Sequence, residues 1–371
     1  MKKDLGPAGA NLPALRSHNA ALVLDLLRTA GEPGISRLEL ADRTGLTPQA
    51  VSKITARLRA EGLVAEAGRR ASTGGKPRTV LRLVPSAGYA VGVHLDRDEL
   101  TVLLADLTGA TVAERRRPLD LGAGAGPVLG AVESEVRALL NRGADTDGAD
   151  TAGSGAGGTA GAVVGVGVAM PGPLDHRAGV PGRVTGFPAW DGHPVRDELA
   201  RRLGLPVVLD KDTNAAALGL ALRPAAPGSF AYVHLGTGLG AGLVLGGVPL
   251  RGDRTGAGEL GHQTVQLDGP PCGCGGRGCL EVLCLAAVAR GDLGEAARIL
   301  GTGAANLVRL LDIDQVLLGG RVVLAAPEVF ADGVRAVLAG LGLPAPVAVA
   351  AGPRAVAEGA AWLILGPIFG Q

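Results

Sequence analysis

The chain has 371 residues, with 36 Lys and Arg against 35 Asp and Glu; 47% of its residues are hydrophobic and only 2% are aromatic. This length predicts two or three domains, with cores built from aliphatic side chains. No apolar run is as long as a membrane helix, and the N-terminal segment lacks the pattern of a signal peptide. We therefore expect a cytoplasmic protein that makes no membrane contact.

The near-neutral net charge hides an asymmetry along the chain. Residues 1–84, called the head below, carry 14 Lys and Arg against 7 Asp and Glu, whereas the remaining residues, the body, carry 22 against 28. A basic head on an acidic body favours a polyanionic partner for the head.

The head has the pattern of three helices with well-marked ends. Residues 17–29 place leucines on one face of a first helix. Ser36 followed three residues later by Glu39 predicts a capping box at the start of a second helix, and Gly45 fits the turn that ends it. Thr47 then predicts the N-cap of a third helix.

A hairpin is predicted after the third helix, with strands near residues 63–64 and 80–83 and a basic, Gly-rich loop at 69–78. Together these elements indicate a winged helix-turn-helix, whose third helix would enter the major groove of double-stranded DNA while the wing approaches phosphates. The candidate DNA contacts are Thr47, Gln49, Ser52, Lys53, Arg57, Arg69, Arg70, Lys76 and Arg78. The alternative is a three-helix packing module whose charges are only solvated.

The body alternates strands and helices. Three consecutive strands are predicted across residues 88–118, then an amphipathic helix at 127–142 and a buried strand at 162–170. The low-complexity residues 143–161 read as a flexible surface loop.

In the second half, a strand, a polar turn and a helix are predicted over residues 205–222, and a Gly-rich pair of strands over 230–250. Mixed strands and helices with Gly turns at the strand ends predict two α/β lobes around a cleft. The expected units are a head at 1–84, a small lobe at 85–206 completed by a C-terminal helix at about 353–371, and a large lobe at 207–352.

Three cysteines and a histidine lie close together in the large lobe. His262, Cys272, Cys274 and Cys279 have spacings of ten, two and five residues. Three thiolates and one imidazole make a closed tetrahedral set, which predicts a structural zinc ion rather than a catalytic one. The alternative is a group of reduced cysteines without metal. Cys284 lies in an apolar helical stretch and is expected to be a small core residue.

The segments "GTGLGAGLVLGGVPLRG", "GAGELGH" and "CGCGGRGCLE" resemble the ROK family of repressors, open reading frames and sugar kinases. The predicted head resembles that of the family's regulator branch. The resemblance implies an actin/hexokinase-like (ribonuclease H-like) body of two lobes with a sugar site between them. It also implies zinc on the same four residues and a homodimer or tetramer.

The resemblance further implies which side chains contact the sugar. Glu259 and His262 of "GELGH" and Glu281 of "CLE" would hydrogen-bond its hydroxyls, and Asp212 matches the catalytic base of the kinases. From the residues alone, Glu259 could be a helix-end carboxylate, Glu281 a solvated charge and Asp212 a helix N-cap.

Kinases of this family begin the body with an Asp-x-Gly-x-Thr-like phosphate loop, and this chain has "HLDRD" there. His94 replaces the aspartate, Asp96 and Arg97 hold the glycine places, and Asp98 holds the threonine place. These bulky and acidic side chains would keep phosphates away, so we expect neither ATP binding nor an enzyme.

The expected function is therefore a DNA-binding transcriptional regulator, a repressor of carbohydrate metabolism genes, that senses a sugar or sugar derivative. One alternative is an ATP-dependent sugar kinase with a fused DNA-binding head. Another is a ligand-independent regulator with a decayed pocket. Many members of the family that the chain resembles have a sugar-contacting asparagine four residues before a tryptophan, and this chain has Gly186 at that place before Trp190.

Overall fold

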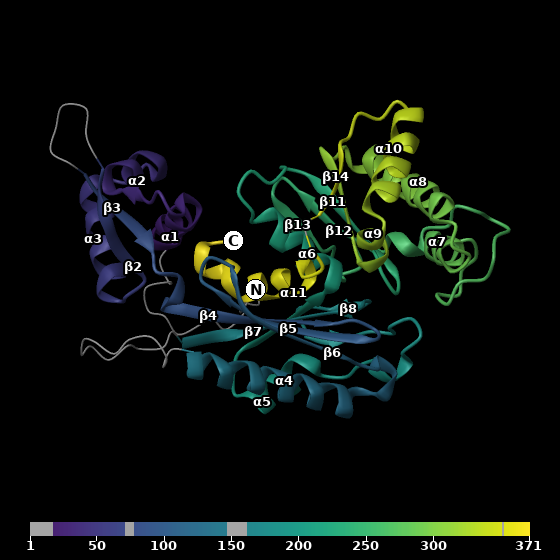
Figure 1. The fold of residues 1–371 in the computed structure, drawn as a ribbon, viewed down its shortest axis with the longest axis horizontal. Coiled ribbons are helices and arrows are strands. Elements are labelled where there is room, and N and C mark those ends of the chain that lie inside the picture. Colours follow the sequence, from purple (N-terminus) through teal and green to yellow (C-terminus); the bar gives the residue numbers. More distant parts are fainter. Residues whose placement is uncertain (1–17, 71–77, 147–161, 351) are drawn as a thin grey trace, which may run out of the picture.

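The computed structural model describes residues 18–70, 78–146, 162–350 and 352–371, although the side chains of residues 70 and 142–146 are not described. Figure 1 shows the head beside a two-lobed body. The predicted wing residue Lys76 and most of the predicted low-complexity loop lie outside the described residues. Within the described part of the chain, no helix combines the length and the apolar character needed to cross a bilayer.

Three helices and a small antiparallel sheet form the head. The helices are α1 (His18–Ala30), α2 (Arg37–Thr44) and α3 (Pro48–Ala60). The sheet has the order β1-β3-β2, from β1 (Ile35–Ser36), β2 (Val64–Arg70) and β3 (Arg78–Leu83). The two-residue strand β1 is absent from the sequence prediction because it is too short to show a period.

The helix ends of the head follow the predicted chemistry. The Ser36 hydroxyl accepts the Glu39 N–H, and the Glu39 carboxylate accepts the Ser36 N–H at 2.8 Å, which confirms the capping box. Gly45 has φ 68 at the end of α2, and the Thr47 hydroxyl accepts the Ala50 N–H at the start of α3. These bonds satisfy donors that a helix terminus leaves free, and so fix the angle between α2 and α3.

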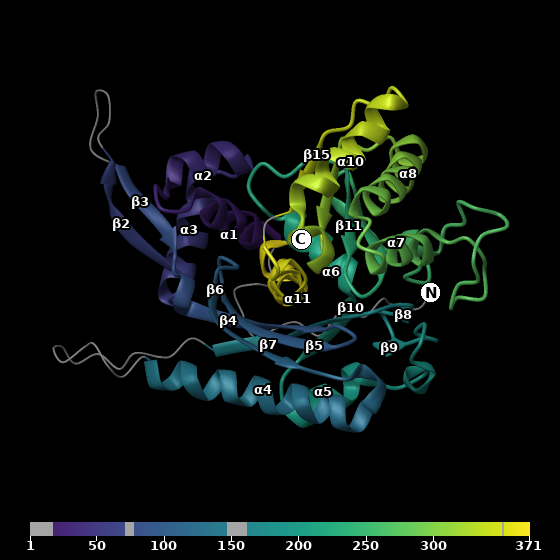
Figure 2. The same ribbon diagram turned by 45° about the vertical axis from the view of Figure 1, so that its right-hand side comes forward.

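The first lobe is a five-stranded sheet with α4 (Ala125–Thr146) and α5 (Val195–Leu203) on one face and α11 (Ala355–Leu365) on the other (Figures 1 and 2). Its strand order is β10-β7-β4-β5-β6. The strands are β4 (Gly88–Leu95), β5 (Glu99–Asp106), β6 (Thr111–Pro118), β7 (Ala162–Met170) and β10 (Val207–Lys211). Because β10 pairs with β7, residues 207–211 lie in the first lobe, and the expected boundary at 207 is too early.

The second lobe has a sheet of order β13-β12-β11-β14-β15. Its strands are β11 (Phe230–Leu235), β12 (Leu239–Leu245), β13 (Val248–Leu250), β14 (Gln315–Gly319) and β15 (Val347–Val349). One face carries α7 (Leu280–Ala289), α8 (Leu293–Leu311) and α10 (Pro327–Gly340), and α9 (Arg321–Ala325) follows β14. The small hairpin β8 (Leu174–Asp175) and β9 (Val180–Pro181) lies beside the first lobe.

Two helices, α6 (Asp212–Ala221) and α11, lie between the two sheets in backbone contact with their neighbours. A Cβ on Gly359 of α11 would lie 1.9 Å from the Ala215 carbonyl oxygen of α6. A Cβ on Gly167 of β7 would lie 1.8 Å from the Ala360 carbonyl oxygen of α11. Only glycine permits such approaches, so these positions set the distances between α6, α11 and the first sheet.

The head is fused to the body by a shared core. Strand β3 passes into β4 through a single 3-10 turn, Pro85–Ala87, with no longer linker. Side chains of α1 and of the C-terminal segment belong to one hydrophobic cluster, which includes Leu24, Leu27, Leu365 and Phe369. The head therefore has a defined position on the body.

Replacing Gly359 by Ala places a methyl group against the backbone of α6, which cannot move aside as a side chain can. We expect Gly359→Ala to lower the free energy of unfolding by about 3 kcal/mol, measured by urea denaturation. The control is Gly340→Ala at the end of α10, where a Cβ meets nothing within 4 Å. It should be neutral or stabilising by up to about 1 kcal/mol. Equal effects of both variants would contradict the close contact.

Candidate functional site

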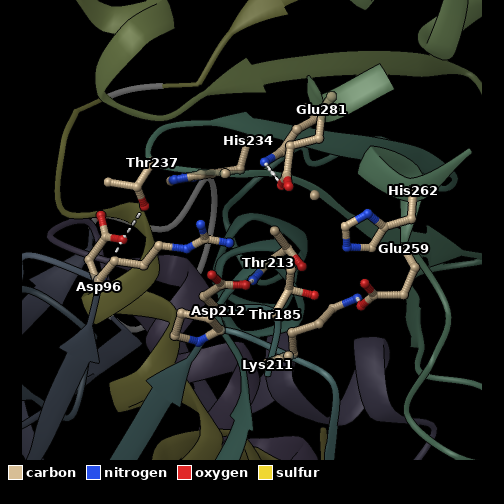
Figure 3. Close-up of a pocket in the computed structure, with 16 residues that line it drawn as sticks. Asp96, Thr185, Lys211, Asp212, Thr213, His234, Thr237, Glu259, His262 and Glu281 are labelled. Atoms are coloured by element: carbon tan, nitrogen blue, oxygen red, sulfur yellow. Dashed lines mark hydrogen bonds and ion pairs between the residues drawn. The ribbon is translucent and has the colours of Figure 1, made fainter. Parts of the chain in front are cut away.

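A cavity lies between the two lobes, at the ends of β4, β10 and β11. Its lining includes all four side chains expected to contact a sugar: Asp212, Glu259, His262 and Glu281 (Figure 3). The cavity volume is about 60 Å³, well below the roughly 300 Å³ or more of ordinary small-molecule sites. The enclosed part of the cleft is therefore small in this structure.

Asp212 stands at the junction of β10 and α6. The strand runs directly into the helix, so Asp212 is the first helical residue and Lys211 holds the N-cap position. The sequence reading of a polar turn here, with Asp212 as the cap of a helix starting near Asn214, is wrong. The Asp212 carboxylate accepts the Thr213 N–H at 2.6 Å, and burial raises its pKa to about 7.

Lys211 is a cavity residue that the sequence analysis missed. Its side chain is 3% exposed and donates to the Ala257 carbonyl at 2.6 Å and to Glu259 at 3.1 Å. The cation holds Glu259 toward the cavity (Figure 3), whereas no capping bond from the Glu259 side chain forms at the following 3-10 turn. In the sequence, a lysine between two aspartates has the pattern of a solvated surface charge. Only its position beside Asp212 could have indicated that Lys211 lines the cavity.

Glu281 is buried in the first turn of α7, which excludes the alternative of a solvated charge. Its carboxylate accepts the Leu239 N–H at 2.9 Å. Leu239 begins β12 directly after the Gly-rich turn, so Glu281 ties α7 to that turn while it lines the cavity.

The place of the kinase phosphate loop holds an ion cluster that joins the lobes. Arg321 of the second lobe donates to Asp96 at 2.6 Å and to Asp98 at 2.8 Å, and the Thr237 hydroxyl donates to Asp96 at 2.7 Å. Burial opposes ionisation of Asp96, but nearby His94 and these hydrogen bonds lower its pKa to about 2. The cluster therefore remains charged at neutral pH.

The four expected metal ligands meet at one point. The candidate ligand atoms of His262, Cys272, Cys274 and Cys279 all lie within 4.8 Å of one another. Cys274 Sγ is 3.7 Å from Cys279 Sγ, and Cys272 Sγ is 3.7 Å from His262 Nδ1. A tetrahedral zinc ion with Zn–S bonds of about 2.3 Å separates its sulfurs by about 3.8 Å, so this set fits zinc.

The backbone around these ligands folds tightly. Gly278 has φ 59, and a Cβ there would lie 1.7 Å from the Gln266 carbonyl oxygen. The Gly276 N–H points at Cys274 Sγ at 3.4 Å, as expected for a thiolate. Because His262 also lines the cavity, a metal held here would fix one wall of the cleft.

The structure and this donor set predict one tightly bound zinc ion per chain. Cys274→Ser should reduce the metal content, measured by mass spectrometry of metals after dialysis, to below about a fifth, because one thiolate of four ligands is lost. Cys284→Ser is the matched control, since Cys284 is buried in α7 and contacts the Ala296 carbonyl instead. Equal zinc content in both variants would contradict the assignment.

On the head, the candidate DNA residues of α3 face solvent. Gln49, Ser52, Lys53 and Arg57 are exposed, whereas Val51 is buried. Of the other candidates, Thr47 caps α3, Arg69 and Arg78 are exposed on the wing strands, and Arg70 is described in its backbone alone. Whether these residues touch DNA stays a prediction.

Comparison with known proteins gives the family. The ROK family profile matches residues 154–290, and a winged helix-turn-helix DNA-binding profile matches residues 23–65. The crystal structure of a ROK hexokinase from Thermus thermophilus is 30% identical over 75% of this chain and 97% of that one, with a TM-score of 0.57. The chain belongs to the ROK family.

The predicted winged head and two-lobed α/β body are confirmed together. A ROK family transcriptional regulator homologous to the E. coli MLC protein has the same fold over 95% of this chain and 96% of its own, with a TM-score of 0.74 and 22% identity. The xylose repressor of Bacillus subtilis (strain 168) is 28% identical over 67% of this chain, and the chain spans 61% of that relative's length. ROK relatives thus include both regulators and kinases.

The raised pKa of Asp212 has a consequence for stability. Its carboxyl titrates near pH 7 in the folded protein but near 3.8 when unfolded, so the unfolded chain releases this proton first and stability falls as pH rises from 4 to 7. Asp212→Asn removes that loss. The difference in unfolding free energy between the variant and wild type should grow in favour of the variant by up to about 1.4 kcal/mol per pH unit in this range. Above about pH 8 the difference should become constant. Parallel pH profiles from urea denaturation would contradict the buried carboxyl.

Proposed function

We propose that this protein is a DNA-binding transcriptional repressor of carbohydrate metabolism genes that senses a sugar or sugar derivative between the lobes of its ROK body. The observation that carries this is the shared core of head and body. Helix α1 packs against α3, the exposed candidate DNA helix, and also against the C-terminal segment that follows the cleft helix α11. The named regulators among its relatives support it.

Arg28 gives this coupling a definite route. From α1 of the head it donates to the Leu222 carbonyl at 3.1 Å, directly after α6, and stacks on Trp362 of α11 at 5.0 Å from its ring centroid. Helix α6 begins at Asp212 in the cavity, about 15 Å from its other end. A sugar that moves Asp212 would shift a rigid helix whose far end contacts the head.

A kinase function has less support. The cluster of Asp96, Asp98 and Arg321 fills the place where the kinases hold phosphates, so ATP would have to break ion pairs between the lobes. We therefore propose that the chain is not an enzyme and needs no ATP. Zinc on His262 and its three cysteines is proposed as a structural cofactor.

The missing asparagine at Gly186 does not leave the cavity without polar groups. The neighbouring Thr185 lines the cavity and offers a hydroxyl. This favours a retained sugar site over a decayed one. We further propose that a cytoplasmic homodimer or tetramer places pairs of heads on two half-sites of operator DNA.

The test joins DNA selection with calorimetry. Repeated selection from random duplexes should enrich one sequence motif with half-sites, and zinc-loaded protein should bind one class among hexoses, pentoses, amino sugars and their phosphates. Glu259→Ala should weaken sugar binding at least about 100-fold, since one carboxylate accepting two sugar hydroxyls is lost, and leave DNA affinity unchanged.

Glu328→Ala is the matched control, because Glu328 is exposed on α10 away from the cavity. Its sugar and DNA affinities should equal those of wild type. DNA binding with no sugar response across the panel would contradict sensing, and turnover of ATP with any of these sugars would contradict the assignment as a regulator.

A further inference from the structure

One cation of the cleft, Arg97, makes no ion pair with any residue that the structure describes. Arg97 lies in the turn between β4 and β5 and lines the cavity. Among the described residues, its side chain makes no ion pair or side-chain hydrogen bond, and its guanidinium lies 5.8 Å from the Phe187 ring centroid. A Cβ on Gly238 would lie 2.9 Å from Glu281 Oε2, so this carboxylate is near Arg97 without forming an ion pair with it. A Cβ on Gly238 would lie 3.2 Å from Arg97 Nη2, so the guanidinium reaches the Gly-rich turn of the opposite lobe.

The carboxylates around Arg97 are already engaged elsewhere. Arg321 binds both neighbours of Arg97, Asp96 and Asp98. Glu259 pairs with Lys211, and Glu281 accepts a backbone N–H. Burying a guanidinium that pairs with none of these anions costs free energy, unless a ligand or water accepts hydrogen bonds from its N–H groups.

Asp212 lies between the two ends of the cavity. Figure 3 shows Asp96 and Thr237 at one end and Glu259 and His262 at the other, with Asp212 between them. Because burial raises the pKa of Asp212 to about 7, its carboxyl is partly protonated at neutral pH and can donate to an anionic oxygen. The end near Arg97 is therefore suited to an anion, and the far end to hydroxyls.

We propose that the effector is an anionic sugar, whose phosphate or carboxylate group binds Arg97 while its ring hydroxyls face Glu259 and His262. A guanidinium offers two parallel N–H donors that match either anion, which a neutral sugar cannot use. This inference rests on the proposed sugar-sensing function and names its ligand class. A nucleotide fits less well, because the Arg321 cluster occupies the rest of the loop.

Calorimetry with matched ligands tests the proposal. The probes are glucose, galactose and N-acetylglucosamine, the 6-phosphates of each, glucuronate and galacturonate, with inorganic phosphate and ATP alone. The 6-phosphate or the uronate of one sugar should bind at least about tenfold more tightly than the neutral sugar, and the tighter of the two identifies the anionic group. The preference should weaken as salt is raised.

Arg97→Gln should remove this preference and leave the affinity for the neutral sugar within about twofold. Arg309→Gln, an exposed arginine near the end of α8, is the control and should keep the preference. Thermal unfolding of each variant without ligand checks that the fold is intact.

The other outcomes overturn the proposal. Neutral and charged sugars of equal affinity, or a preference that survives Arg97→Gln, would contradict the role of Arg97 while sensing stands. Inorganic phosphate or ATP binding as tightly as any sugar phosphate would contradict the ligand class. If no sugar of the panel binds, although the protein is folded and binds DNA, this inference and the proposed sensing function are overturned together.

Discussion

Backbone contact between helices and sheets at glycine positions determines how this molecule is put together. Helix α11 meets α6 at Gly359 and the first sheet at Gly167, and α6 meets the second sheet at Gly242, where a Cβ would lie 2.0 Å from the Thr213 carbonyl oxygen. At such distances backbone packs directly on backbone, with no side chain between the two elements. A displacement of α6 would therefore press on α11 and on the second sheet.

The cleft and the head depend on these same two helices. The amino end of α6 carries Asp212 into the cavity, and its carboxyl end accepts a hydrogen bond from Arg28 of the head. The C-terminal segment after α11 packs against α1. Zinc on the four proposed ligands would act from another side of the cleft, by fixing the wall that carries His262 and, close by, Glu259. The Arg321 cluster spans the lobes and opposes their separation.

Local chemistry made much of this predictable. The caps at Ser36 and Thr47 and the spacing of the cysteines act over a few residues, so the sequence shows them directly. Contacts between distant residues were not predictable. Nothing near Lys211 in the chain indicates Glu259, and nothing near Arg28 indicates Trp362. The direct passage from β10 into α6 was missed because "DKDTN" has the composition of a turn.

The most direct test of the account is thermodynamic linkage between the cleft and the head. Operator affinity is measured by fluorescence anisotropy with and without saturating effector, in wild type and in Arg28→Ala. The account predicts a shift of at least about fivefold in wild type, and a much smaller shift in Arg28→Ala although that variant still binds both ligands. An equal shift in both proteins, or no shift in wild type that binds both ligands, would contradict it.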